Sequence, residues 1–298
     1  MDSEVAVARV NGGGSGDVAH CGAERPAPAR APRAARTPAV AMLAMAGRLW
    51  FVVAVAGQLM FALYISVLYG GAVLSGNLDG FNTVMPKGRT PGDTLGNTTI
   101  YTHLFFAVLI ILGGALQLIP QIRRRAPWLH RWTGRAYIVA AMLASLGGVY
   151  LVWVRGTVGD VTQHVGMTMN AALIVFCGYM AWRAARARDF VQHRRWAMRV
   201  FLAASGVWFF RVGLMLWLLI HRRPVGFDGD TFTGPFLSAL TFGESLGPIL
   251  LLQVYLWAQT SGAARGKAAT AIALVVLTCA MAAGIFAATM GMWLPRMK

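Results

Sequence analysis

Residues 49–75 read LWFVVAVAGQLMFALYISVLYGGAVLS and contain no charged side chain. An α-helix needs about 20 consecutive, mostly apolar residues to cross the hydrocarbon core of a bilayer. This stretch is long enough, and we expect it to be the first membrane span. Six similar stretches follow, at about 99–120, 132–154, 162–183, 197–220, 238–259 and 269–294. The sequence therefore predicts an all-α fold, a polytopic bundle of about seven transmembrane helices.

The composition of the 298-residue chain excludes two other classes of protein. Only 13% of the residues are charged and 57% are hydrophobic, whereas a soluble domain carries about 25% charged residues. The net charge of +16 could suggest a nucleic-acid partner. However, the basic residues lie in short loops between apolar runs and do not cluster on one solvated face. The expected partner is the lipid bilayer and not a nucleic acid.

The N-terminal segment, residues 1–47, differs in composition from the rest. It is rich in Ala, Gly, Pro and Arg and has almost no aromatic residues. Such a segment buries too little apolar surface to offset the entropy lost on folding. We expect a disordered tail over 1–47 and a transmembrane domain over 48–298.

The distribution of basic residues predicts the orientation. Most of the 27 Lys and Arg residues lie in the tail and in the loops after the second, fourth and sixth spans. Cytoplasmic loops of membrane proteins carry an excess of Lys and Arg. The N-terminus is therefore predicted inside and the C-terminus outside.

Four consecutive spans carry one histidine each, at two depths. His103 and His164 lie near the predicted outer ends of spans 2 and 4, whereas His130 and His193 lie at the inner starts of spans 3 and 5. The region of about 99–220 would then form a histidine-bearing four-helix core. Residues around the inner histidines are also similar in the two copies, which suggests two related hairpins arranged as a parallel repeat.

Paired histidines on facing helices can clamp one haem iron from both sides, because neutral imidazole is a good axial ligand. Two pairs would hold two b-type haems, one near each surface. The residues on the helix faces next to the histidines are mostly small. Small residues leave room for a macrocycle, and they equally permit close helix packing. An interfacial or structural role for each histidine remains the simpler alternative.

Charged residues near these histidines are candidates for contacts with haem propionates, because guanidinium pairs well with carboxylates. On a straight helix, Arg211 lies about 27 Å from His193, at the outer depth. Arg135 and Arg199 belong to the inner basic cluster, which could equally bind anionic lipid. Glu244 could pair with Arg211 and hold spans 5 and 6 together, or could relay protons.

The motifs His130-Arg-Trp-Thr-Gly-Arg135 and His193-Arg-Arg-Trp-Ala-Met-Arg199 resemble those of a family of predicted bacterial integral membrane proteins, classed as a domain of unknown function. The resemblance covers roughly 99–215. It implies a multi-pass protein of the bacterial cytoplasmic membrane and supplies no activity.

By topology alone, the chain is also similar to the ascorbate-reducible dihaem b-type cytochromes. Their four ligating histidines lie on four successive helices, and the second helix pairs with the fourth and the third with the fifth. That resemblance implies the pairs His103–His164 and His130–His193. The present chain departs from the pattern by an additional span at its C-terminal end.

The leading hypothesis is a dihaem b-type transmembrane electron carrier. It would be a membrane oxidoreductase if it reduces a substrate at the outer face, with quinol or a small reductant as donor. One alternative is a non-haem transporter or structural membrane protein. A smaller alternative is a seven-span zinc hydrolase, which needs three protein ligands at one depth. No catalytic residue is predicted.

Overall fold

The computed structural model describes residues 37–85 and 87–297, and this part of the chain is almost entirely helical. Three helices are extended by π-helical turns, Ser66–Gly70 after the first, Leu151–Gly156 after the fifth and Thr289–Trp293 after the tenth. The helices are α1 (Pro38–Ile65), α2 (Gly71–Leu74), α3 (Thr94–Leu118), α4 (Pro120–Arg125), α5 (Pro127–Tyr150), α6 (Val161–Arg186), α7 (Phe190–Ala204), α8 (Gly206–His221), α9 (Pro235–Thr260) and α10 (Ala264–Ala288).

The predicted membrane fold is confirmed. Six helical stretches are long and apolar enough to cross a membrane, and the bent pair α7–α8 raises the number to seven if it forms one span. Each stretch covers one of the seven predicted spans. The protein is therefore a multi-span helical membrane protein that is surrounded by lipid.

The first helix begins earlier than the sequence suggested. Helix α1 starts at Pro38, whereas the expected boundary between tail and membrane domain was at residue 48. Proline suits the first position of a helix, because its fixed φ matches the helix and its missing N–H is not needed there. Ala, Met and Leu then continue the helix, since these residues have high helix propensity. Residues 1–36 of the predicted tail lie outside the described residues.

The fifth span is broken, and the expectation of one straight helix over 197–220 is wrong. Helices α7 and α8 meet at 52°. Ser205 separates them, and its hydroxyl donates to the carbonyl of Phe201 at 2.7 Å while its N–H bonds to both Phe201 and Leu202. A serine that bonds back to the preceding turn bends a helix. The 27 Å separation of His193 and Arg211 along one axis therefore does not apply.

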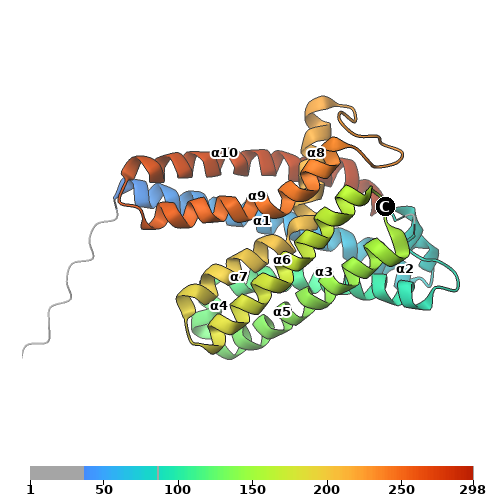
Figure 1. Cartoon of the computed structure of the whole chain (residues 1–298), viewed down its shortest axis with the longest axis horizontal. Helices are drawn as coiled ribbons and strands as arrows, with labels where there is room; N and C mark the ends of the chain where they lie inside the picture. Colours follow the sequence, from blue (N-terminus) through green and yellow to red (C-terminus); the bar gives the residue numbers. More distant parts are fainter. Residues whose placement is uncertain (1–36, 86, 298) are drawn as a thin grey trace, which may run out of the picture. The chain divides into compact units, whose positions relative to one another are not determined.

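The four histidine-bearing helices form two hairpins that pack together. Helix α3 packs against α5, α6 packs against α7, and α5 joins the hairpins by packing against α6 (Figure 1). Helix α7 also contacts α3, so the four helices close into a ring. In this ring α3 lies diagonally from α6, and α5 lies diagonally from α7.

The remaining long helices pack around α8. Helix α10 lies along α1 and also contacts α8, while α9 contacts α8, α7 and α6 (Figure 1). Glycine permits the closest approach, because a Cβ on Gly284 of α10 would lie 2.5 Å from the carbonyl oxygen of Val212. Aromatic packing joins α1 to the segment after α10, because Phe61 and Tyr64 of α1 pack against Trp293.

Candidate functional site

The middle of the four-helix ring is filled by side chains from all four helices. Tyr137 of α5, Cys177 of α6 and Val200 of α7 are buried together, with Ile110 of α3 packed against them. A neighbouring cluster contains Ala141, Ile174 and Ala203. Any space for a cofactor therefore lies toward the two ends of the ring, where the histidines are.

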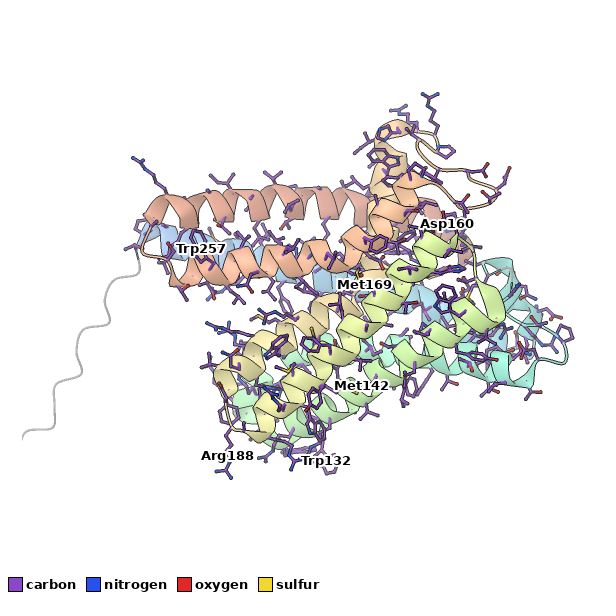
Figure 2. All side chains as sticks on the ribbon, in the orientation of Figure 1. Trp132, Met142, Asp160, Met169, Arg188 and Trp257 are labelled. Atoms are coloured by element: carbon purple, nitrogen blue, oxygen red, sulfur yellow. The ribbon has the colours of Figure 1, made fainter. Side chains whose placement is uncertain are left out.

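The two ends can be followed along helix α6. Figure 2 shows Asp160 at one end of α6, and Arg188 beyond its other end, at the same end of the ring as Trp132. His164 follows Asp160 closely, whereas His130 precedes Trp132 and His193 follows Arg188. The structure thus places His130 and His193 at one end of the ring and His164 at the other, as the sequence predicted.

His103 lies against helix α5. Its Nδ1 atom is 2.9 Å from the carbonyl oxygen of Ala144. Gly148, one turn further along α5, faces the same ring, because a Cβ there would lie 3.4 Å from Cε1 of His103. The small residues of α5 therefore let the imidazole lie close to its backbone.

His164 has a ring nitrogen that is both buried and without a partner among the described residues. Its Nε2 atom is buried and makes no hydrogen bond with the described residues. The ring lies edge-on to Trp153, with 5.7 Å between the centroids. Trp153 in turn donates to the hydroxyl of Thr168 on α6 at 2.9 Å, which holds the indole beside the histidine. A buried, unpaired nitrogen is costly unless something else binds it.

His193 repeats the arrangement of His103 at the other end of the ring. Its Nδ1 atom is 2.9 Å from the carbonyl oxygen of Ala181 on α6. A carbonyl only accepts hydrogen bonds, so Nδ1 carries the proton in both rings. The Nε2 atoms of His103 and His193 keep their lone pairs, and neither has a hydrogen-bond partner among the described residues. This is the tautomer that ligates a metal through Nε2.

His130 is held differently, by the side chain of Gln117 on α3. The amide orientation that suits the other neighbours of Gln117 directs its nitrogen at Nδ1 of His130, at 2.9 Å. A half-turn of the amide would present its oxygen and give His130 the same tautomer as His103. His130 and His193 lie at the same end of the ring, and the pairing of their imidazoles on one group stays a prediction.

The two histidine motifs also share a local structure. Arg135 stacks on Trp132 with 5.1 Å from the guanidinium carbon to the ring centroid, and Arg199 stacks on Trp196 at 4.7 Å. Both pairs have the spacing i, i+3, which places two side chains on one helix face. The repeated contact agrees with the sequence similarity that suggested two related hairpins.

The structure places the two inner arginines on different surfaces. Arg135 and Trp132 are exposed on α5, whereas Arg199 is half-buried and donates to the side chain of Gln253 on α9 at 2.8 Å. Neither arginine makes an ion pair within the described part of the chain. The role of both in propionate binding stays a prediction.

Arg211 lies on α8, within electrostatic range of the His103 ring. Its charge acts on the His103 ring and also on Tyr64, Tyr69 and Glu244. The guanidinium stacks on Phe61 at 5.2 Å and donates one hydrogen bond, to the carbonyl of Val207. The expected ion pair with Glu244 is absent from residues 37–85 and 87–297, where only two other ion pairs occur. Most of its donors are therefore available to another acceptor.

Sequence reasoning singled out Glu244 but missed the other buried polar residues around the break between α7 and α8. Gln58 of α1 donates to Ser205, and Asn170 of α6 is buried close to Gly206. Side-chain atoms of Gln58, Asn170, Trp208, Glu244 and Ser245 are buried there without a hydrogen-bond partner. The available signal was an amide side chain inside an apolar run, which is costly in a membrane and marks a candidate functional site.

The zinc alternative finds no supporting geometry. Within the described residues, no three side chains among His, Cys, Asp and Glu lie close enough together to hold a metal ion. A catalytic zinc site needs three protein ligands. Pairs of histidines, in contrast, are what two bis-histidine sites require.

Comparison with known families supports the resemblance seen in the histidine motifs. A family model described as "Predicted membrane protein (DUF2306)" matches residues 100–227. This region runs from α3 to just beyond α8 and contains all four histidines and Arg211. The expected relation to a family of predicted membrane proteins of unknown function is thereby confirmed. The topological resemblance to dihaem cytochromes has no counterpart in these comparisons. None of the curated proteins and none of the solved structures matches the chain.

Proposed function

We propose that this membrane protein is a dihaem b-type electron carrier of the bacterial cytoplasmic membrane. The observation that carries the proposal is the state of the histidine nitrogens. Nδ1 of His103 and of His193 is engaged by a backbone carbonyl, and Nε2 of His164 is buried without a partner. Imidazole nitrogens in these states, on helices that lie diagonally across the four-helix ring, would be suited to ligate two haems.

The residues divide into an outer and an inner set. His103 and His164 would ligate the outer group, and His130 and His193 the inner one. When bound, bis-imidazole haem supplies reversible one-electron chemistry. The carbonyls of Ala144 and Ala181 orient the rings of His103 and His193, and the Gln117 amide orients His130.

Arginine contributes charge at both ends. Arg211, within electrostatic range of His103 and with most of its donors free, is suited to hold an outer propionate. Arg199 and Arg135 are candidates for the inner propionates, and Arg199 is the better placed because it is half-buried. A quinol or a small reductant is the proposed class of electron donor.

A reduced-minus-oxidised absorption spectrum of the purified protein, produced with ample haem supply, tests the proposal. We expect a b-type α-band at about two haems per chain. His103→Ala and His130→Ala should each remove about half of it, and the double variant should remove all of it. His221→Ala is the matched control, because this histidine bonds to Trp217 within its own helix and lies outside both pairs. A flat spectrum in folded protein would overturn the proposal and favour the non-haem transporter or structural alternative.

The role of Arg211 is tested separately by redox titration. Loss of a positive charge near a haem favours its oxidised form, so Arg211→Gln should lower the midpoint potential of one component and leave the other unchanged. Arg211→Lys retains the charge and should shift the potential less. Equal potentials in Arg211→Gln and the wild type would exclude Arg211 from the outer site.

A further inference from the structure

Glu244 is an acidic residue in the membrane-spanning part of the protein. It lies on α9, its side chain is only 6% exposed, and Oε2 has no hydrogen-bond partner. The other acidic residues of the described part lie outside the long helices, in loops, before helices or in the short 3-10 helix Leu78–Thr83: Asp79, Asp93, Asp160, Asp189, Asp228 and Asp230. Burying an ionisable carboxyl inside the membrane costs free energy, so such a residue is a candidate for a functional role.

Polar side chains from two other parts of the chain meet Glu244 at the helix break. A Cβ placed on Gly206 would lie 2.8 Å from Nδ2 of Asn170 and 3.3 Å from Oε1 of Glu244. Asn170 and Ser245 are themselves buried, and Oδ1 of Asn170 and Oγ of Ser245 have no partner. Asn170 and Glu244 thus converge on the first residue of α8, and Ser245 directly follows Glu244 in α9.

The backbone is irregular on both sides of this cluster. Helix α7 ends at Ala204 and α8 begins at Gly206, while α9 contains Pro248 in its interior. Proline has no N–H and cannot donate the helical hydrogen bond to the carbonyl of Glu244, four residues earlier. Irregular backbone at membrane depth occurs where it is buried in protein or lines a polar site, and broken helices frame the ion sites of transporters.

The charges around Glu244 do not neutralise it by contact. From α8, the charge of Arg211 acts on the carboxyl, yet no ion pair joins the two among the described residues. The facing groups from α6 and from the break are Asn170, Ser205 and Gly206, and none of them titrates. A proton on the carboxyl removes the buried charge and turns one oxygen from an acceptor into a donor. A protonated carboxyl can donate to an unpartnered acceptor such as Oδ1 of Asn170, while Oγ of Ser245 and Nε1 of Trp208 are buried nearby without partners as well.

We propose that Glu244, together with Asn170 and the break at Ser205–Gly206, forms a proton-binding site inside the membrane. The site takes one proton from water onto the carboxylate and returns it, without any other bond forming or breaking. It involves none of the four histidines and does not depend on haem. The proposed function and this site can therefore fail independently.

Infrared spectroscopy of the purified protein in lipid nanodiscs tests the site, because an un-ionised carboxyl has a C=O stretch that a carboxylate lacks. We expect that band at neutral pH in the wild type, and its loss in Glu244→Gln. Asp189→Asn, which changes an exposed residue before α7, should leave the band unchanged. Asn170→Leu should shift its frequency, because the neighbouring amide is removed.

Isotope labelling keeps the test decisive if Glu244→Gln does not fold. The chain has three glutamates, Glu4, Glu24 and Glu244, so the variant Glu4→Gln/Glu24→Gln leaves Glu244 as the only one. Carbon-13 glutamate should then shift the band. Absence of the band at neutral pH in folded wild-type protein overturns the proposal. A band whose frequency does not change with carbon-13 glutamate also overturns it. A band that disappears on addition of sodium chloride at constant pH identifies a metal-cation site instead and also overturns it.

Discussion

The side-chain amide of Gln58 on α1 donates a hydrogen bond of 2.9 Å to the hydroxyl of Ser205, 147 residues later in the chain. Both side chains are buried. The hydroxyl of Ser205 in turn donates a hydrogen bond to the carbonyl of Phe201. The contact therefore connects α1 to the point where the fifth span breaks. The position of α8, and with it that of Arg211, depends on this junction.

Replacing Gln58 by leucine should destabilise the protein. The variant removes the donor to Ser205, and a hydrogen bond between helices in a membrane contributes about 0.6 kcal/mol on average and up to about 2 kcal/mol. We expect a lower midpoint of thermal unfolding in detergent. The neighbouring Leu59 is exposed, so Leu59→Ala is the control and should change the midpoint less. Equal midpoints for Gln58→Leu and the wild type would contradict a structural role for the bond.

Gly206 should not tolerate a side chain. A methyl group there would meet Asn170 at 2.8 Å and Glu244 at 3.3 Å, and overpacking of a buried site costs about 1–3 kcal/mol. We expect Gly206→Ala to lower the unfolding midpoint. Gly243 of α9 has open space at its Cβ, and alanine is favoured over glycine in a helix by about 0.5–1 kcal/mol. Gly243→Ala should therefore be neutral or stabilising, and a similar loss in both variants would argue against a specific clash.

The contact of α3 with the centre of the ring depends on Gly114. A Cβ on this residue would lie 3.0 Å from Phe201 and 3.2 Å from Tyr137, whereas at Gly113 the closest atom is 3.5 Å away. Gly114→Val should therefore destabilise the protein by about 1–3 kcal/mol, and Gly113→Ala should have little effect. Unfolding by SDS titration in mixed micelles measures both. If Gly114→Val and Gly113→Ala change the stability equally, Gly114 does not make the close contact with Phe201 and Tyr137.

Arg155 organises the loop that precedes α3. Its guanidinium is 4% exposed, lies 3.7 Å from Asp93 and donates to Asn97 at 2.8 Å. Arg155→Gln shortens the side chain and removes the charge, so the loop should open more often. Trypsin should then cleave faster after Lys87 and Arg89, while cleavage after Arg222, in the other long loop, serves as the internal control. Unchanged rates at Lys87 and Arg89 would show that Arg155 does not hold the loop.

The predicted orientation can be tested with sealed membrane vesicles. If the N-terminus is inside, trypsin added to right-side-out vesicles should cleave after Arg89 and Arg222. In inverted vesicles it should cleave between Arg123 and Arg125 and after Arg194, because the loops rich in basic residues face the cytoplasm. The reverse pattern would mean that the protein is inserted the other way round.

Much of the membrane domain was predictable from local sequence. Apolar length alone located the six spanning helices and the bent pair α7–α8, since each span is surrounded by lipid and its hydropathy is a property of consecutive residues. The depths of His130, His164 and His193 followed from the same spacing. The start of helix α1 and the straightness of the fifth span were misjudged. Proline at the first position of α1 and the hydrogen bond from Ser205 to the preceding turn set those features, and hydropathy indicates neither.

The candidate sites were only partly predictable, for a different reason. Pairing of His130 with His193 could be proposed from the sequence, and so could the proximity of Arg211 to the outer histidines. The partners of each ring nitrogen could not, because they depend on how each helix is rotated against its neighbours. The convergence of Asn170 and Glu244 on Gly206 was likewise hidden, since these residues belong to three helices far apart in the chain.

The sequence by itself determined that this chain crosses the membrane about seven times and carries four histidines at two depths. It could do so because the free energy of transferring a helix from water into lipid depends on that helix's own consecutive residues. Only the tertiary structure decided which imidazole nitrogens are engaged, that Arg211 and Glu244 do not pair, and that a buried carboxyl meets a broken helix. Those outcomes arise from side-chain packing between distant helices, where distances of a few tenths of an ångström separate a contact from a clash.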